Sequence, residues 1–272
     1  MKAPVRLVAT DLDGTLVHSD GSVTARSRAA LVAAEEAGVQ VVFVTGRPLR
    51  WAEEVFEHVG GHGQAIVSNG ALVWDVARTR VHLMRAIEPT IGVEVAGRVR
   101  AAVPDTHFAV ETLAGIALEP DFLERHPVPD GSVRGSIEQI FATPAVKLLA
   151  RHETLEPPEF WARAEAAIGE LAEVTWSSST SLLEISAGGV TKASTLALLC
   201  AELGITAEEV LAIGDMPNDL PMLAWAGTSY AMANAHPTVR AAADRVAPAN
   251  DDDGVAQVIE SLLDSRVGPW QD

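Results

Sequence analysis

Short runs of β-branched and apolar residues alternate with alanine-rich amphipathic segments along much of this chain. Such alternation is typical of a parallel sheet whose strands are joined by crossover helices. Apolar runs at 6–10 and 39–46 flank an amphipathic segment at 24–37, and Gly38 follows that segment as a helix-terminating residue would. The sequence therefore predicts an α/β fold built on a parallel sheet.

The pattern changes between about residues 81 and 186. Longer strand candidates there interleave with helical segments at 91–103 and 160–171, and proline and glycine cluster between 120 and 144. After Gly188 the first pattern returns. We therefore predict two domains, with a core domain formed by residues 1–80 and 187–272 and a separate α/β domain, residues 81–186, inserted into it.

Charge and cysteine content restrict the partners and the compartment. The 272 residues include 20 Lys and Arg and 37 Asp and Glu, which gives a formal net charge of −17. Such a chain repels polyanions, so we expect neither nucleic acid nor a membrane as its partner. A single cysteine, Cys200, excludes an internal disulfide framework, and it is expected to be a buried apolar residue of a helix. No signal peptide or membrane span is evident, so we expect a cytoplasmic protein, either a monomer or a small homo-oligomer.

Two acids follow the first apolar run directly. Asp11 and Asp13 stand in the sequence DLDGT, where the run ends. Ligands of open parallel sheets bind beyond the carboxyl ends of the strands, so the two acids are placed where chemistry is expected. Two neighbouring carboxylates repel each other unless a cation or a shared proton compensates them. An ordinary Asp/Gly turn would explain this motif equally well if it stood alone.

Further polar residues follow other predicted strands. Thr45, Gly46 and Arg47 end the second strand, and Asp215, Asn218 and Asp219 follow the apolar run VLAIG. Thr45 and Asp219 could instead cap helices. Lys192 stands at the start of a predicted helix, where the helix dipole disfavours a cation, although a solvated surface lysine would also fit there.

These residues together suit phosphoryl transfer. Carboxylates at Asp11 and Asp215 with a main-chain carbonyl are ligands of the kind that Mg²⁺ takes. An Asp beside Mg²⁺ is a competent nucleophile that forms an aspartyl-phosphate. Lys192, Thr45 and the metal would balance the charge on the phosphoryl oxygens.

The segments DLDGT, VTGR, Lys192 and GDMPND resemble, in this order, the four motifs of the haloacid dehalogenase (HAD) superfamily of phosphohydrolases. The insertion of about a hundred residues between the second motif and Lys192 resembles the Cof-type branch, as does the C-terminal stretch that begins AMANAHP. This resemblance covers nearly the whole chain. It implies a Rossmann-like parallel sheet core and an α/β cap that selects the substrate. Ala193 and Ala233 stand where the family usually has glycine.

The resemblance also implies roles for individual residues. Asp11 would be the nucleophile and a Mg²⁺ ligand, and Asp13 would be the general acid and base, with its main-chain carbonyl on the metal. The remaining implied roles are metal binding by Asp215, a position behind the metal for Asp219, phosphate binding by Thr45, Gly46, Lys192 and Asn218, and a substrate contact by Asn69. Arg47 follows the threonine motif at the edge of the expected cleft, where it could grip the substrate or the cap or be an exposed structural arginine.

The expected function is therefore Mg²⁺-dependent hydrolysis of a small phosphorylated metabolite. Sugar phosphates are the first substrate expected, followed by pyridoxal phosphate (PLP) and flavin mononucleotide (FMN). A phosphomutase of the same fold is the alternative, since nothing at Asp11 or Asp13 separates the two reactions. A phosphate-metabolite sensor without turnover is the third hypothesis, which the complete set of catalytic motifs disfavours.

Overall fold

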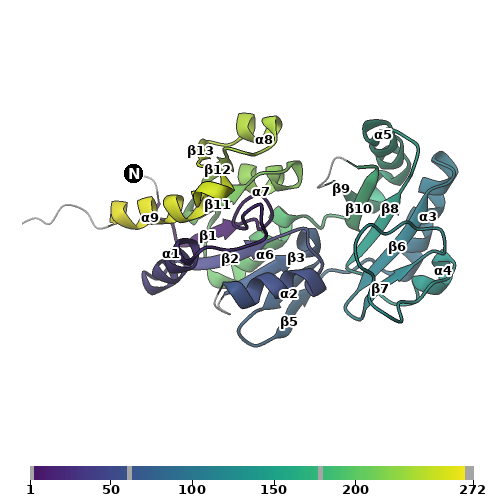
Figure 1. Cartoon of the computed structure of the whole chain (residues 1–272), viewed down its shortest axis with the longest axis horizontal. Coiled ribbons are helices and arrows are strands. Elements are labelled where there is room, and N and C mark those ends of the chain that lie inside the picture. Colours follow the sequence, from purple (N-terminus) through teal and green to yellow (C-terminus); the bar gives the residue numbers. More distant parts are fainter. Residues whose placement is uncertain (1–2, 60–62, 177–179, 267–272) are drawn as a thin grey trace, which may run out of the picture.

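The computed structural model describes residues 3–59, 63–176 and 180–266. Two sheets are present, each with its own hydrophobic core. Both ends of the chain build the first body, and the middle of the chain builds the second body beside it (Figure 1). The fold is thus α/β, as the sequence predicts, with a mostly parallel sheet at its centre.

The first sheet has eight strands in the order β13-β12-β11-β1-β2-β3-β4-β5. Neighbouring strands from β13 to β3 are parallel, and β4 and β5 extend the sheet as antiparallel hairpins. Every residue of β1 is buried, because helices cover both faces of this central strand. The strands are β1 (Leu7–Thr10), β2 (Gln40–Val44), β3 (Gln64–Val67), β4 (Leu72–Asp75), β5 (Arg80–Met84), β11 (Val210–Gly214), β12 (Thr228–Met232) and β13 (Arg245–Ala247).

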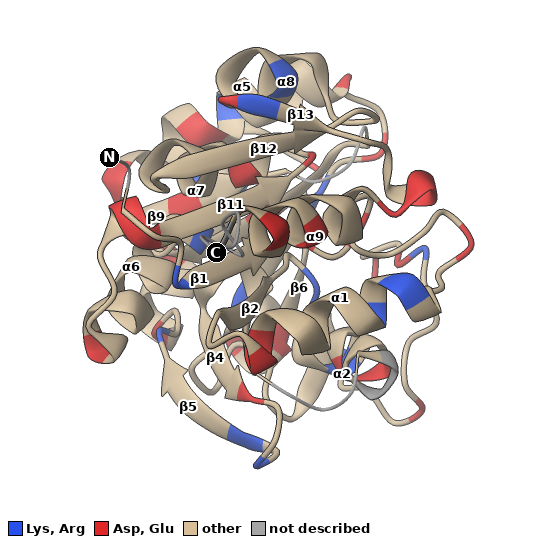
Figure 2. Ribbon diagram, turned by 90° about the vertical axis from the view of Figure 1, so that its left-hand side faces the viewer, with Lys and Arg blue, Asp and Glu red and all other residues tan. Residues whose placement is uncertain are grey.

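The helices of the first body connect these strands. They are α1 (Ala25–Glu36), α2 (Leu49–His58), α6 (Lys192–Leu203), α7 (Leu220–Trp225), α8 (Pro237–Ala242) and α9 (Gly254–Arg266). Thr24 caps α1 by accepting a hydrogen bond from the Ser27 N–H, and α1 packs beside α9 (Figure 2). Cys200 is buried on α6, as expected, and burial raises the pKa of its thiol to about 11.

The second body is an antiparallel sheet with helices on one side. Its strand order is β7-β6-β8-β10-β9, and α3 and α4 lie on the side that faces away from the first sheet (Figure 1). The elements are α3 (Pro89–Ala102), β6 (His107–Thr112), β7 (Gly115–Leu118), α4 (Ile137–Ile140), β8 (Lys147–Arg151), α5 (Pro157–Ile168), β9 (Ala172–Thr175) and β10 (Leu182–Ala187).

The expected start of the inserted domain, residue 81, falls inside β5. This strand pairs with β4, so the chain remains in the first sheet until Met84. The first pairing within the second body joins Ile87 to Ala145. Among the described residues, no helix is long and apolar enough to cross a membrane.

Candidate active site

The carboxyl ends of three adjacent strands form the floor of the site. Strands β11, β1 and β2 are parallel neighbours, and they end just before Asp215, Asp11 and Thr45. All three residues are buried. One carboxylate oxygen from each of Asp11, Asp215 and Asp219 lies within 4.8 Å of the other two. The structure therefore brings together acids that are more than 200 residues apart in the sequence.

Lys192 lies between two of these acids. Its Nζ atom donates to Asp11 Oδ1 at 2.7 Å and to Asp219 Oδ1 at 2.6 Å, and the side chain is 1% exposed. Lys192 is thus no surface residue. The first turn of α6 carries it into the site, and Thr191 caps that helix by accepting a hydrogen bond from the Ser194 N–H.

The carboxylates and the ammonium shift one another's ionisation. Burial raises the pKa of Asp11 well above its usual value, and the charges of Asp219 and Asp215 add to this shift while Lys192 opposes it. Burial also raises the pKa of Asp215 to about 7, with a further contribution from Asp219. For Lys192, burial lowers the pKa, but Asp11 and Asp219 together outweigh burial and raise it above its usual value. The site therefore holds more negative charge than one lysine compensates.

The glycines of two motifs allow this close approach. Gly14 has a φ of +68°, and a Cβ atom there would lie 2.4 Å from Asp215 Oδ2. A Cβ atom on Gly214 would lie 2.6 Å from the Asp219 carboxyl carbon. A larger side chain at either position would push an acid out of the cluster.

Asp219 differs from the other two acids in its hydrogen bonds. Its Oδ1 atom accepts from Lys192, and its Oδ2 atom accepts from the main-chain N–H groups of Asp215 and Met216, each at 3.0 Å. It occupies the N-cap position of α7, but within the described part of the chain its side chain makes no hydrogen bond to the N-terminus of that helix. Asp219 therefore holds the loop after β11 and Lys192 in place.

The donor set of this cluster fits a hard divalent cation. The three acids are oxygen ligands, and their excess negative charge is of the kind that a bound cation compensates. Asp215 Oδ1 accepts a hydrogen bond from Thr15 at 3.2 Å, which orients this carboxylate. Because both oxygens of Asp219 already accept hydrogen bonds, Asp11 and Asp215 are the better ligands.

Asp13 and Arg47 face each other at the edge of the site. The guanidinium of Arg47 donates to both carboxylate oxygens of Asp13, with Nε 2.8 Å from Oδ2. This pairing raises the pKa of Arg47. Asp13 is half-exposed, with 56% of its side chain open to solvent, so its carboxylate is accessible from the cavity.

Thr45 and Gly46 form the loop after β2. Thr45 Oγ1 accepts a hydrogen bond from the Arg47 N–H at 3.0 Å. The alternative that Thr45 caps α2 is wrong, because Pro48 occupies that position. A buried hydroxyl and a glycine main chain therefore lie beside Asp11, where the oxygens of a bound phosphoryl group can be held.

Asn69 and Asn218 connect the floor of the site to the second body. Asn218 donates to Asn69 Oδ1 at 3.2 Å, and Asn69 donates to Glu184 Oε2 at 2.6 Å. Lys147, on β8, donates to the same Glu184 oxygen and to the carbonyl oxygen of Gly46. Asn218 Oδ1 is buried without a hydrogen-bond partner among the described residues.

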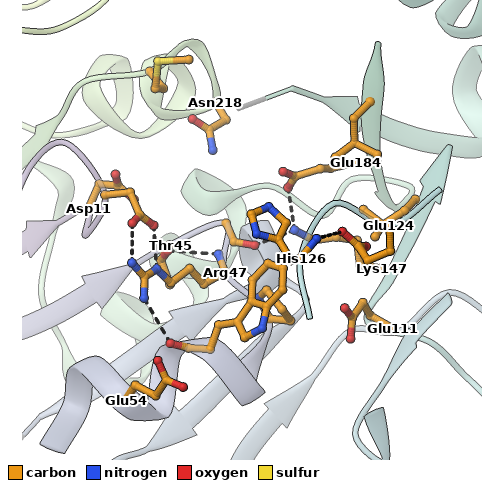
Figure 3. A pocket seen from close by; sticks show the side chains of 17 residues that line it. Asp11, Thr45, Arg47, Glu54, Glu111, Glu124, His126, Lys147, Glu184 and Asn218 are labelled. Atoms are coloured by element: carbon orange, nitrogen blue, oxygen red, sulfur yellow. Dashed lines mark hydrogen bonds and ion pairs between the residues drawn. The ribbon is translucent and has the colours of Figure 1, made fainter. Parts of the chain in front are cut away.

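A cavity of about 470 Å³ lies between the two bodies. Asp11, Asp13, Thr45, Gly46, Arg47 and Asn218 line it from the first body, whereas Asp215, Asp219 and Lys192 lie behind its surface. Figure 3 shows Asp11 and Thr45 on one side of this cavity and Glu111, Glu124, Lys147 and Glu184 on the other.

The site residues of the second body were not predicted from the sequence. Lys147 in AVKLLA and Glu184 in SLLEIS are the signals that were available, because each is a charged residue next to apolar residues of a strand candidate. Trp51 and Glu54, which line the cavity from α2, were not predicted either.

Comparisons with known proteins agree with this geometry. The profile of the haloacid dehalogenase-like hydrolase family matches residues 8–259. The 5-amino-6-(5-phospho-D-ribitylamino)uracil phosphatase of Bacillus subtilis is 31% identical over 257 residues, which are 94% of each chain. The pyridoxal phosphate phosphatase of Escherichia coli is 28% identical and is matched over 95% of this chain and 98% of its own.

The solved structures show the same fold. SMU.1108c from Streptococcus mutans has a TM-score of 0.84 and 25% sequence identity, and the match covers 96% of this chain and 99% of that one. The family profile spans most of the chain, and both named relatives are phosphatases. The chain therefore belongs to the Cof-type branch of the haloacid dehalogenase-like hydrolase family.

Proposed function

We propose that this protein is a Mg²⁺-dependent phosphatase that hydrolyses a small phosphorylated metabolite through an aspartyl-phosphate on Asp11. One observation carries the proposal: the buried Asp11 carboxylate contacts Lys192, lies beside Asp215, and lines a cavity that the second body covers. A nucleophile, a fixed cation and an enclosed space for the leaving group are what this reaction requires.

In the first step a carboxylate oxygen of Asp11 attacks phosphorus. Lys192 holds this carboxylate through its 2.7 Å hydrogen bond, so little reorganisation is needed. Thr45 and the main chain of Gly46 bind the phosphoryl oxygens, joined by Asn218. The Asn218 Oδ1 atom lacks a hydrogen-bond partner among the described residues, so rotation of the amide that places Nδ2 there, in exchange for the hydrogen bond to Asn69, would let it donate to a bound oxygen.

Asp13 is the proposed general acid and base. It protonates the leaving oxygen and later takes a proton from the water that hydrolyses the aspartyl-phosphate. For this it must release at least one of its two hydrogen bonds from Arg47. Arg47 therefore positions Asp13 before the substrate binds and is free to contact substrate afterwards.

Asp11, Asp215 and the main-chain carbonyl of Asp13 are the residues that would hold Mg²⁺. When bound, the ion supplies positive charge that stabilises the phosphoryl oxygens and the crowded carboxylates. Asp219 keeps its position behind the ligands, bound to Lys192 and to the loop of Asp215.

The second body makes a small substrate the natural choice. A cavity of about 470 Å³ lies within the range of small-molecule sites, and a covering domain excludes large phosphoproteins. Sugar phosphates are the first candidates. Pyridoxal phosphate, on which the Escherichia coli relative acts, and flavin mononucleotide come next.

Phosphate release from a panel of these compounds tests the proposal. With Mg²⁺ we expect release from at least one compound class, and we expect a chelator to abolish it. The Asp11→Asn variant should lose nearly all turnover while still binding phosphate and Mg²⁺. Release that persists in the chelator would contradict the metal-dependent mechanism.

Product analysis separates the alternatives. Transfer of phosphate to another position of a bound sugar, without free phosphate, would indicate a phosphomutase. Tight binding of a phosphorylated compound by both wild type and Asp11→Asn, with turnover by neither, would indicate a sensor.

A further inference from the structure

The wall of the cavity carries more acid than base. Six of its lining side chains are carboxylates, against the cations Arg47 and Lys147. Four of the six carboxylates have a cationic partner. The pairs are Asp11 with Lys192, Asp13 with Arg47, Glu111 with Arg50, and Glu184 with Lys147.

Glu54 and Glu124 are the two carboxylates that remain. Within the described ranges 3–59, 63–176 and 180–266, neither forms an ion pair. Glu54 is exposed on α2. Glu124 is half-buried in the loop after β7, and its Oε1 atom accepts hydrogen bonds from the main-chain N–H groups of Arg125 and His126. Figure 3 shows Glu124 across the cavity from Asp11. The cavity therefore carries two carboxylates that no ion pair of the described residues neutralises, although Arg47 interacts with Glu54 and Arg151 with Glu124 at longer range.

We propose that this charge makes the site selective against a leaving group that carries a second anion, and in favour of one that carries an ammonium group. The inference rests on the proposed phosphatase activity and specifies its substrate class, namely phosphorylated amino sugars and neutral polyols rather than phosphorylated acids or bisphosphates. Lys192 contacts Asp11, and Arg47 contacts Asp13, at the end of the cavity where the phosphoryl group is proposed to bind. Lys147 pairs with Glu184. No described lysine or arginine that lines the cavity is therefore left to bind a second anion near Glu124. Like charges brought together in a partly desolvated site discriminate strongly between ligands of similar shape.

Three hexose phosphates of similar size provide the test. Glucosamine 6-phosphate carries an ammonium group, glucose 6-phosphate is neutral outside its phosphate, and 6-phosphogluconate carries a carboxylate. We expect kcat/KM to fall in that order, with glucose 6-phosphate at least about tenfold better than 6-phosphogluconate. N-acetylglucosamine 6-phosphate is the uncharged control for the bulk at the amine position.

Charge-neutralising variants assign the effect to the two residues. In the double variant Glu54→Gln and Glu124→Gln, the ratio of kcat/KM between glucose 6-phosphate and 6-phosphogluconate should shrink to about threefold or less. The matched control is Glu53→Gln with Asp121→Asn, which removes the same charge from exposed neighbours that do not line the cavity. The control should keep the wild-type ratio. Each single variant should shrink the ratio in part.

The outcomes separate this inference from the proposed function. If neither the sugar phosphates nor p-nitrophenyl phosphate releases phosphate, the proposed activity itself fails. Where p-nitrophenyl phosphate is hydrolysed but the sugars are not, their competitive inhibition constants supply the same ratios. Equal constants for the acidic and neutral sugars, or a ratio that the double variant leaves unchanged, would overturn the charge selectivity alone.

Discussion

Lys192 determines the electrostatics of the acidic cluster. Its ammonium lies between Asp11 and Asp219, and all three side chains are almost fully buried. A buried carboxylate that loses its cationic partner keeps the full penalty of desolvation. The lysine therefore stabilises the folded state in addition to its proposed role in binding phosphate.

Replacing Lys192 with methionine tests this dependence. We expect Lys192→Met to lower the free energy of unfolding in EDTA by about 3–5 kcal/mol, because two buried carboxylates lose their partner. Urea denaturation gives the value. Adding Asp219→Asn, which removes one of these charges while keeping an oxygen acceptor, should recover part of the loss. A double variant no more stable than the single one would contradict this account.

The sequence could predict the floor of the site but not its roof. Asp11, Thr45 and Asp215 follow strands of one parallel sheet, and the strand-end rule alone places such residues together. Lys147 and Glu184 face the core only because of how the second body packs on it, which no local pattern encodes. The pairing of Asp13 with Arg47 was not predicted either, because Asp13 is expected to be the general acid and base and Arg47 to face the substrate or the cap.

Among the elements, α3 depends on a glycine for its packing. A Cβ atom on Gly92 would lie 2.1 Å from the ring of Phe141, and this residue is only 1% exposed. Gly92 therefore allows α3 to approach the short helix α4, which ends just before Phe141.

An alanine at position 92 should destabilise the second body. We expect Gly92→Ala to cost about 1–3 kcal/mol through overpacking, despite the better helix propensity of alanine. A Cβ atom on Gly97, in the same helix, would have no atom of the described residues within 4 Å, so Gly97→Ala should instead stabilise by up to about 1 kcal/mol. Thermal unfolding of both variants decides the point. If Gly92→Ala and Gly97→Ala melt at the same temperature, the ring of Phe141 can move aside at little cost and the expected overpacking is absent.

Asp253 ties the start of α9 to the start of α1. Its Oδ1 atom accepts hydrogen bonds from Thr24 at 2.6 Å and Ser27 at 3.2 Å, and lies 3.1 Å from His18 Nε2. The hydrogen bond from Thr24 is the main reason that the pKa of Asp253 lies below its usual value. Asp253 thus orders two helix ends.

Because the pKa of Asp253 is lowered, its contribution to the free energy of unfolding depends on pH in a known direction. A carboxyl whose folded pKa is lowered adds stability above its unfolded pKa, and this stability is lost as the pH falls through the folded pKa. We expect Asp253→Asn to cost about 1 kcal/mol at pH 7, and the difference from wild type to narrow below about pH 4. Asp252→Asn is the matched control, because Asp252 is an exposed neighbour of the same charge. Urea denaturation at pH 7 and 3.5 should show no comparable narrowing for this control.

Local patterns predicted some elements to the residue and misplaced others. The predicted helix that starts at Lys192 is α6, and the predicted amphipathic segment at 24–37 forms α1, with Thr24 as its cap. Their caps and apolar periodicity are local features, which a sequence displays directly. The run VHLMRAI was assigned to the inserted domain, yet most of it forms β5 at the edge of the first sheet. Which sheet an edge strand joins depends on long-range pairing.

At the scale of the whole molecule, polar contacts join the two bodies across the cavity. Lys147 donates to the carbonyl oxygen of Gly46, and Asn69 donates to Glu184. On the other side of the cavity, Arg50 on α2 forms two hydrogen bonds with Glu111 on β6, with Nη2 2.6 Å from Oε1. Because the Glu111 side chain is only 2% exposed, its charge depends on Arg50 when the two bodies are closed.

Removing Arg50 should therefore open the molecule. In Arg50→Gln, the mostly buried Glu111 carboxylate loses its cationic partner and is better hydrated when the second body moves away, so the population should shift toward an open arrangement. We expect a larger radius of gyration in small-angle scattering and several-fold faster amide exchange in peptides that contain Gly46 and Lys147. Arg98→Gln, which breaks an exposed ion pair within α3, is the control and should change neither quantity.

A second substitution separates opening from simple loss of a contact. If the buried charge of Glu111 drives the opening, Arg50→Gln combined with Glu111→Gln should close the molecule again, because a neutral amide costs far less to bury than a carboxylate. If the ion pair itself holds the bodies together, the double variant should be as open as Arg50→Gln. The exchange rate at Gly46 distinguishes the two cases, because only the first predicts that the double variant exchanges as slowly there as the wild type does.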